Sequence, residues 1–162
     1  MEKQLQHFEY LVYNDINGLE DTDSWLLKEA REVTQHAYAP YSRFQVGAVI
    51  KLANGEIIAG SNQENASFPI GLCAERVALA SAASVYPDIP IDTIAISYHN
   101  LNGTSTHPIS PCGMCRQALA EYEMKQQTPI RLILGGLSGQ VFVISRANDL
   151  LPLSFSGNAM NT

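Results

Sequence analysis

The dipeptide Asn54-Gly55 constrains the fold most, because it lies between two short runs of residues that favour β-strands. The first run covers Phe44–Leu52 and the second covers Glu56–Gly60. An Asn-Gly pair between two such runs is typical of a two-residue type I′ turn. The sequence therefore predicts an antiparallel hairpin over residues 44–60.

A second antiparallel pair is predicted near the C-terminus. Ile130–Leu134 and Gln140–Ser145 are rich in β-formers, and the glycine-rich residues 135–139 join them. A connection this short cannot make a parallel crossover, so the two strands must run antiparallel. Its glycines join two strands and do not open a helix, which favours a turn over a phosphate-binding loop.

Helices and one buried strand are predicted between these pairs, from apolar spacing, N-caps and prolines. The first helix has the apolar stripe Leu26, Ala30, Val33 and Ala37, with Asp23 or Ser24 as its N-cap and Pro40 after its end. The other elements are a helix over Arg76–Ala83, a strand over Ile91–Tyr98, and a helix from the N-cap Ser110, through Pro111, to about Met124.

These elements predict one α/β domain with a mixed five-stranded sheet and helices on its faces. In residues 8–13, Phe8, Tyr10 and Val12 alternate with three other residues, and the segment is rich in β-formers. It therefore favours an extra N-terminal strand. We expect residues 1–22 to be an extension packed on the domain, residues 23–156 to form the domain itself, and residues 157–162 to be a tail.

The composition argues for a folded protein with a small ligand. Hydrophobic residues make up 46% of the chain and charged residues 16%, an ordinary balance for a globular domain. Ten Lys and Arg against sixteen Asp and Glu give a formal charge of −6, whereas polynucleotide binding needs a basic surface. No apolar run has the length of a membrane span, and the first residues lack the pattern of a secretory signal. We therefore expect neither nucleic acid nor membrane as a partner, and a cytoplasmic location.

The three cysteines form an odd set, which leaves at least one outside any disulfide. Cys112 and Cys115 are three residues apart at the start of a predicted helix, so their sulfurs point to one side. Cys73 directly precedes another predicted helix. Free amide groups and the helix dipole at such positions favour the thiolate, which is the form that binds metal.

Three protein ligands with an open fourth position are the plan of a catalytic zinc site. No fourth ligand is obvious, because the histidines lack the paired spacing of zinc fingers (His7, His36, His99 and His107). Two alternatives stay open. One is a thioredoxin-like redox pair, although Cys112 and Cys115 do not follow the first strand of a βαβ unit. The other is a structural zinc knuckle.

Five motifs, taken together and in order, resemble the zinc-dependent cytidine deaminase family. Cys73-Ala74-Glu75 and Pro111-Cys112-Gly113-Met114-Cys115 resemble the signature of the zinc nucleoside and nucleotide deaminases. The resemblance covers residues 26–155 and also rests on residues 38–48, Asn62–Ala66 and Leu150–Pro152. Nucleic-acid-editing relatives generally have His at the position of Cys73 and a parallel final strand pair. Cys73, the antiparallel pair and the acidic charge therefore indicate the free-nucleoside branch.

The resemblance implies a three-layer α/β/α fold and hydrolytic deamination of cytidine and deoxycytidine, with one zinc ion per chain. It assigns the metal to Cys73, Cys112 and Cys115. It implies that Arg76 offsets the excess thiolate charge. It also implies that Glu75 takes a proton from the attacking water and delivers protons to N3 of the base and to the leaving amine.

The resemblance also implies substrate contacts. Asn62 and Glu64 resemble the pair that binds the ribose hydroxyls, and Phe44 resembles the aromatic residue on the pyrimidine ring. The backbone of Ala74, with the side chain of Glu75, would contact the base edge. Phe155 resembles a C-terminal aromatic residue that reaches a neighbouring subunit's site in a homotetramer. The plainer alternatives are a strand end for Asn62, a solvated charge for Glu64, and core positions for both phenylalanines.

Some features depart from the family pattern, and two rival functions stay open. Phe68 replaces a frequent tyrosine, residues 100–109 form a longer loop, and the first twenty residues have no counterpart in the smallest members. One rival is a deaminase of a cytosine-bearing antibiotic such as blasticidin S, against which Asn62 and Glu64 argue. The other is a noncatalytic zinc-stabilised binding module, against which Glu75 argues.

Overall fold

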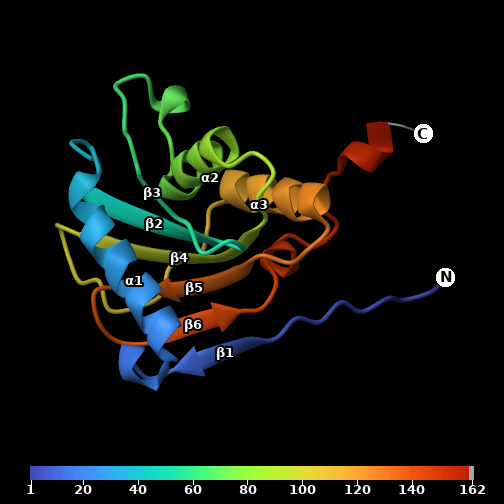
Figure 1. The fold of residues 1–162 in the computed structure, drawn as a ribbon, viewed down its shortest axis with the longest axis horizontal. Helices are drawn as coiled ribbons and strands as arrows, with labels where there is room; N and C mark the ends of the chain where they lie inside the picture. The colour runs from blue at the N-terminus through green and yellow to red at the C-terminus, as the bar shows by residue number, and fades with distance from the viewer. Residues whose placement is uncertain (161–162) are drawn as a thin grey trace.

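The computed structural model describes residues 1–160, and within them six strands form one mixed sheet in the order β1-β6-β5-β4-β2-β3 (Figure 1). The extra N-terminal strand thus adds a sixth strand to the five that were predicted. Within this part of the chain, β4 and β5 are the one parallel pair of neighbours. The strands are β1 (Tyr10–Tyr13), β2 (Phe44–Leu52), β3 (Ile57–Ser61), β4 (Ile91–Asn100), β5 (Arg131–Gly135) and β6 (Val141–Ile144).

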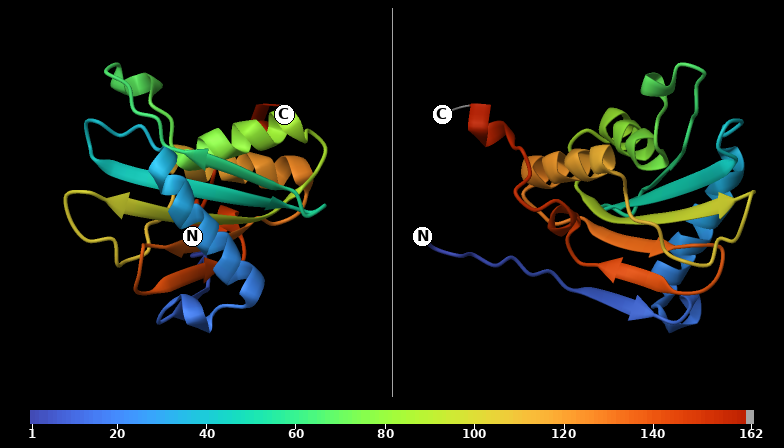
Figure 2. Two further views of the ribbon diagram at one scale, coloured as in Figure 1. Left: turned by 60° about the vertical axis from the view of Figure 1, so that its left-hand side comes forward. Right: turned by 180° about the vertical axis from the view of Figure 1, so that it is seen from behind.

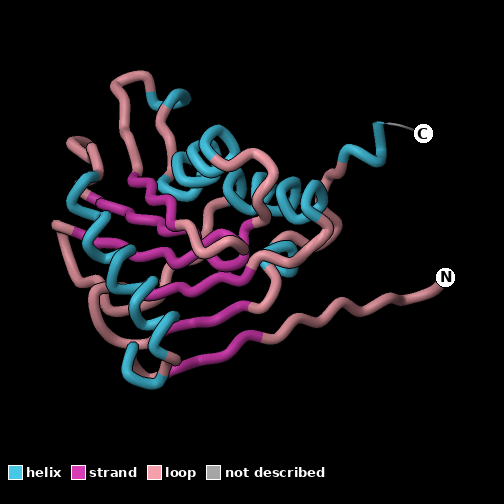
Figure 3. Tube along the Cα trace, viewed as in Figure 1, coloured by secondary structure: helices cyan, strands magenta, loops and turns pink. Residues whose placement is uncertain are grey.

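Helices cover both faces of the sheet, as Figures 1 and 2 show, and the tube in Figure 3 separates the three layers. Helix α1 (Asp21–Val33) lies on one face, and α2 (Ala74–Val85) and α3 (Gly113–Gln126) lie on the other. Ala48 and Ile50 of β2 pack in the core under α2 and α3, whereas Val49 packs under α1. This alternation is the period of a strand that is buried on both faces. The predicted α/β/α architecture is confirmed.

Short 3-10 helices fill several connections, and none of the described helices is long and apolar enough to cross a membrane. These segments are η1 (Ile16–Gly18), η2 (Thr34–His36), η3 (Phe68–Ile70), η4 (Ala147–Leu150) and η5 (Gly157–Met160). The last of them lies in the expected tail, of which residues 161–162 are outside the described part of the chain.

The hairpin of β2 and β3 is confirmed, but its predicted turn type is wrong. The strands pair antiparallel from Gly47 opposite Ser61 to Lys51 opposite Ile57. Gly55 donates its N–H to the Leu52 carbonyl at 2.9 Å and has φ +89°, whereas Asn54 has no positive φ. A type I′ turn needs positive φ at both central residues. The chain instead uses a three-residue loop that ends in a left-handed glycine.

The C-terminal strand pair is antiparallel as predicted, and β1 adds to its outer edge. Leu132 lies opposite Ile144, which in turn lies opposite Tyr10. Strand β1 begins at Tyr10, two residues later than Phe8, where the alternating pattern begins. Residues 1–9 are exposed and extend away from the sheet, as Figure 1 and the right-hand view of Figure 2 show.

Helix α1 begins earlier and ends earlier than predicted. Its N-cap is Glu20, not Asp23 or Ser24. Asp23 lies in the first turn, where its carboxylate forms a bidentate ion pair with Arg131 of β5. Because this carboxylate is engaged by a tertiary contact, it does not cap the helix. The helix ends at Val33 and the 3-10 turn η2 follows, so Ala37 lies outside the apolar stripe.

Both helices of the opposite face begin next to a cysteine. Helix α2 is longer than the predicted Arg76–Ala83, and Cys73 is its N-cap. Helix α3 has Cys112 as its N-cap, so the predicted N-cap Ser110 and the residue after it lie before the helix. Neither cysteine makes a side-chain capping hydrogen bond. Their sulfurs are therefore not engaged by the helix backbone.

Candidate active site

A close contact between α2 and β3 fixes where Cys73 lies. At Gly60 of β3, a Cβ atom would lie 2.5 Å from the Ala78 nitrogen and 2.7 Å from the Ala74 carbonyl oxygen. Real Cβ atoms do not approach backbone so closely, so glycine lets the helix rest directly on the strand. The first turn of α2 is thereby held over the sheet, facing the first turn of α3 (Figure 1).

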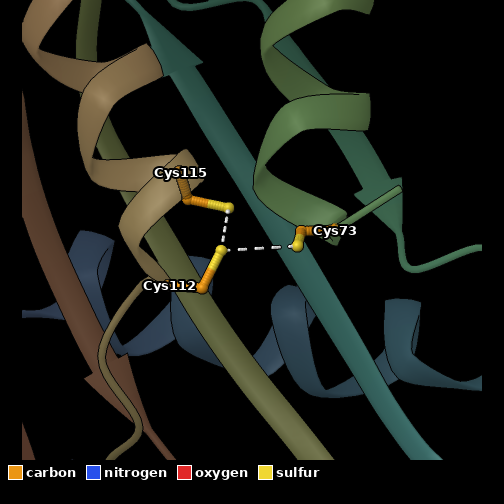
Figure 4. A group of neighbouring side chains, drawn as sticks. All are labelled: Cys73, Cys112 and Cys115. Atoms are coloured by element: carbon orange, nitrogen blue, oxygen red, sulfur yellow. Dashed lines mark hydrogen bonds between the residues drawn. The ribbon is translucent and has the colours of Figure 1, made fainter. Parts of the chain in front are cut away.

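The three cysteine sulfurs meet between these two helix starts (Figure 4). Cys73 Sγ lies 3.7 Å from Cys112 Sγ, which lies 3.4 Å from Cys115 Sγ. Two sulfurs at 2.3 Å from one tetrahedral zinc ion are about 3.8 Å apart. Across the described residues, no His, Asp or Glu joins the group as a further ligand. The cluster fits a zinc ion with one open position.

Electrostatics at the cluster favour a thiolate at Cys73. The neighbouring thiol of Cys115, helped by Cys112 and Arg76 and opposed by burial, lowers the pKa of Cys73 to about 5. The same contact with Cys73, together with burial, raises the pKa of the Cys115 thiol. The three sulfurs are thus close enough to share protons, and a cation that binds all three would replace those protons.

Arg76 lies beside this cluster with one donor unused. Its Nη2 donates to the Gly71 carbonyl oxygen at 2.9 Å, whereas its Nε is buried and has no acceptor within the described chain. The guanidinium also lowers the pKa of Cys73 by hydrogen bonding and by charge. Three thiolates around a dication leave one excess negative charge, and a neighbouring cation offsets it. The orphaned donor therefore fits a metal-loaded cluster.

Glu75 lies in the first turn of α2 and is 5% exposed. Burial raises the pKa of this carboxyl, and the charge of Cys73 raises it further. A carboxyl with a raised pKa can both accept and return a proton near neutral pH. Within the described residues, the group of side chains that could hold a metal ion consists of the three cysteines and does not include Glu75.

Asn62 and Glu64 follow β3 and hold the backbone that leads into β2. The Asn62 amide accepts from the Val46 N–H at 2.7 Å and donates to the Phe44 carbonyl at 2.9 Å. The Glu64 carboxylate accepts from the N–H groups of Tyr41 at 2.8 Å and Ser42 at 3.2 Å. Burial raises the pKa of the Glu64 carboxyl, but these hydrogen bonds outweigh it, so the pKa is lowered. Each side chain retains a donor or lone pairs for a ligand.

A cavity of about 630 Å³ joins these groups, a volume within the range of small-molecule sites. Its walls include seven of the predicted site residues: Asn62, Glu64, Cys73, Ala74, Glu75, Arg76 and Cys112. The remaining lining residues are Tyr41, Ser42, Val46, Gln63, Asn65, Phe68, Gly71, Leu72, Ile109, Ser110 and Met114.

Two predicted substrate contacts do not line this cavity. The ring of Phe44 stacks on Tyr98, with ring centroids 4.9 Å apart. Phe44 lies two residues before Val46, on the same side of β2, and Val46 does line the cavity. Phe155 is 62% exposed, beyond η4, and its carbonyl accepts from the Gln117 amide at 3.0 Å.

Several lining residues were not predicted from the sequence. Tyr41 and Ser42 belong to a motif that was identified, but their contribution is partly through main-chain N–H groups, which residue type does not reveal. Ile109 and Met114 flank or lie within the second cysteine motif. These lining residues could have been predicted from their position in or next to the motifs.

The fold and the site together define a metal-dependent α/β domain with a buried carboxyl beside an open three-thiol centre. Residues 20–128 match the model of the cytidine and deoxycytidylate deaminase zinc-binding region. A cytidine deaminase of Halalkalibacterium halodurans is 40% identical over 136 residues, which cover 84% of this chain and 96% of that protein. A blasticidin-S deaminase of Bacillus cereus is 31% identical over 120 residues, which cover 72% and 81%.

Solved structures agree with these relatives. The crystal structure of cytidine deaminase from Burkholderia pseudomallei has a TM-score of 0.70 and 39% sequence identity, and the match covers 81% of this chain and 97% of that one. The chain belongs to the cytidine and deoxycytidylate deaminase family. The family's zinc-binding region and the clustered thiols identify zinc as the cofactor of the site.

Proposed function

We propose that this protein hydrolyses cytidine and deoxycytidine to uridine and deoxyuridine with release of ammonia. The observation that carries the proposal is the buried carboxyl of Glu75, which lines the same cavity as Cys73 and Cys112 and has a raised pKa. A purely structural zinc site has no need of such a group. The matched cytidine deaminases support the substrate class.

In the proposed reaction, Glu75 moves the protons. When bound, zinc supplies a water of lowered pKa, and hence a hydroxide nucleophile near pH 7. Glu75 accepts one proton from the attacking water and donates it to N3 of the pyrimidine; it then accepts the proton of the new C4 hydroxyl and donates it to the leaving amine. The oxygen of one water becomes bonded to C4, the bond from C4 to the exocyclic nitrogen breaks, and ammonia leaves. One carboxyl near both water and base serves all these transfers.

Groups that line the cavity, together with Phe44 beside it, bind the nucleoside. Asn62 and Glu64 hydrogen-bond the ribose hydroxyls with the donor and lone pairs that the backbone leaves free. The backbone of Ala74 contacts the base edge, and Phe44 turns its ring from Tyr98 towards the pyrimidine when the base enters. Arg76 offsets the charge of the three thiolates.

The assembly proposed for this activity is a homotetramer in which Phe155 reaches a neighbouring subunit's cavity. Its support is an apolar collar around the cavity mouth, formed by Tyr41 (52% exposed), Phe68 (73%), Leu72 (45%) and Met114 (61%). Exposed apolar groups gathered in this way are typical of interaction surfaces. A reducing compartment such as the cytoplasm suits the three free thiol ligands.

The two rival functions predict different reactions. A blasticidin S deaminase would turn over that antibiotic faster than cytidine, and a noncatalytic zinc module would release no ammonia. The deciding experiment incubates zinc-replete protein with cytidine and follows the ultraviolet absorbance and the ammonia. We expect ammonia and uridine in equal amounts, and poor turnover of cytidine monophosphate, because the carboxylate of Glu64 at the ribose end repels phosphate. Zinc-loaded protein that leaves cytidine intact would contradict the proposal.

A further inference from the structure

Arg116 joins two main-chain segments that are far apart in the sequence. Its Nε donates to the Pro111 carbonyl oxygen at 2.9 Å, and its Nη1 donates to the Leu150 carbonyl oxygen at 3.0 Å. Across the described residues Arg116 forms no ion pair. The guanidinium of this half-buried residue therefore serves its two carbonyl acceptors through its rigid planar fork of donors.

The first acceptor belongs to the peptide bond that leads into Cys112. This cysteine has φ −67° and ψ +169°, is exposed, and makes no side-chain capping hydrogen bond. The position of its sulfur therefore depends on the backbone of Cys112 and on the contacts with the Cys73 and Cys115 sulfurs. By holding the carbonyl of Pro111, Arg116 fixes the peptide plane from which the Cys112 side chain projects toward the other two sulfurs.

The second acceptor is the carbonyl at the end of η4, from which the C-terminal segment continues. Leu150 ends this 3-10 helix, and five residues later the Phe155 carbonyl accepts from the Gln117 amide. Arg116 and Gln117 are consecutive in the first turns of α3, directly after Cys115. The helix that carries two of the three thiols therefore also anchors residues 150–155.

We propose that Arg116 is a positioning residue for the metal centre, which braces the Pro111–Cys112 peptide against Leu150. It touches neither metal nor substrate and acts through Cys112. The proposal rests on zinc at the three thiols. Groups that orient metal ligands in this way typically change metal affinity or activity by about 10- to 100-fold when they are removed.

The test measures zinc release from the full-length zinc-loaded protein into excess chelator, detected with a metal-sensitive dye. Arg116→Ala is expected to release zinc about 10- to 100-fold faster than the wild type. Arg116→Lys keeps the charge but has no planar fork to reach both carbonyls, so its release is expected to stay faster than wild type. Arg116→Gln replaces the alanine variant if that variant does not fold. Its amide can still donate to one carbonyl, so its rate of zinc release is expected to lie between those of the wild type and Arg116→Ala.

The matched control is Arg146→Ala, which removes a different arginine contact to the same helix. Arg146 Nε donates to Glu123 of α3 at 3.3 Å, far along the helix from the thiols. This variant is expected to lower the melting temperature and leave the zinc-release rate unchanged. Equal release rates for wild type, Arg116→Ala and Arg116→Gln would overturn the proposal, and so would full rescue by lysine. Both results can be read even if cytidine is not the substrate.

Discussion

Glu75 is a buried carboxyl one residue into the helix that Cys73 caps, and burial raises its pKa. Glu75→Gln keeps the size of the side chain and a hydrogen bond to the base edge but removes its basicity. We expect kcat to fall by at least ~10²–10⁴-fold, the usual effect of losing one general acid–base. Zinc content and melting temperature should stay at wild-type values, because the carboxyl does not ligate the metal.

The measurement pairs steady-state kinetics with elemental analysis of the same preparation. Glu56→Gln is a suitable control, because this carboxylate bonds the Tyr86 hydroxyl at 3.0 Å and does not line the cavity. A Glu75→Gln protein that kept near wild-type turnover would remove Glu75 from the proton transfers, even with zinc in place.

Glu64 offers a separate test of ribose recognition. Its carboxylate already accepts two backbone N–H groups, and the proposal adds a ribose hydroxyl. A hydrogen bond to a charged group contributes about 1.5–3 kcal/mol, so Glu64→Gln should raise the KM for cytidine by about 10- to 100-fold. For 2′,3′-dideoxycytidine, which lacks both hydroxyls, the same substitution should change the KM little. A similar rise for both substrates would instead show that Glu64 only supports the loop of Tyr41 and Ser42.

The chemistry of the site was predictable from residue types, but its supporting hydrogen bonds were not. Cysteine spacing favoured a metal over a redox pair, and the resemblance to the deaminase family then assigned Glu75 its role beside that metal. The Asn62 amide, by contrast, bonds both Phe44 and Val46. That contact depends on the register of two strands, which local sequence patterns do not specify.

At the scale of elements, the contact of α2 with β3 at Gly60 aligns the first helix turn with the thiol cluster. A methyl group there would lie 2.5 Å from the Ala78 nitrogen, so Gly60→Ala must push the helix off the strand. Overpacking of this kind typically costs about 1–3 kcal/mol. We expect a lower urea midpoint of unfolding and faster zinc release, since Cys73 moves with the helix.

The control for this substitution is Gly113→Ala, at the first position of α3. A Cβ there meets nothing within 4 Å, and alanine is the better helix former. Its unfolding midpoint should not fall. If Gly60→Ala were as stable as the wild type and held zinc equally well, the close approach would have no role in positioning Cys73.

Element types were predictable from local patterns, whereas their ends depended on tertiary contacts. The capping preference of Asp and Ser placed the start of α1 at Asp23 or Ser24, but Arg131 of β5 takes the Asp23 carboxylate. Similarly, the preference of Ser for N-caps pointed to Ser110, whereas Cys112 occupies that place in α3. For Asp23, a residue that is distant in sequence takes the carboxylate, and a window of neighbouring residues contains no sign of it.

At the scale of the whole molecule, a single chain exposes two apolar features: the collar around the cavity mouth and the aromatic residue Phe155 near the C-terminus. The main chain at Phe155 is tied to α3 by the hydrogen bond from Gln117 to its carbonyl, and the residue is exposed, while Phe68 and Met114 border the cavity. No described segment of the same chain covers these groups. Closed symmetry would bring the Phe155 of one subunit to the collar of another, and each site would then need two chains.

Mixing two inactive variants tests this sharing of sites directly. Phe155→Ala keeps its own Glu75 but supplies no aromatic ring to a neighbour, whereas Glu75→Gln supplies the ring but cannot transfer protons. Co-expressed at equal levels, the two chains should assemble active sites that neither forms alone. Random assembly gives about one quarter of sites an intact Glu75 and an intact neighbouring Phe155, so activity should recover to roughly that fraction of wild type. Light scattering should report a tetramer for each protein. A mixture no more active than the sum of its parts, or an active monomer, would show that each chain builds its site unaided.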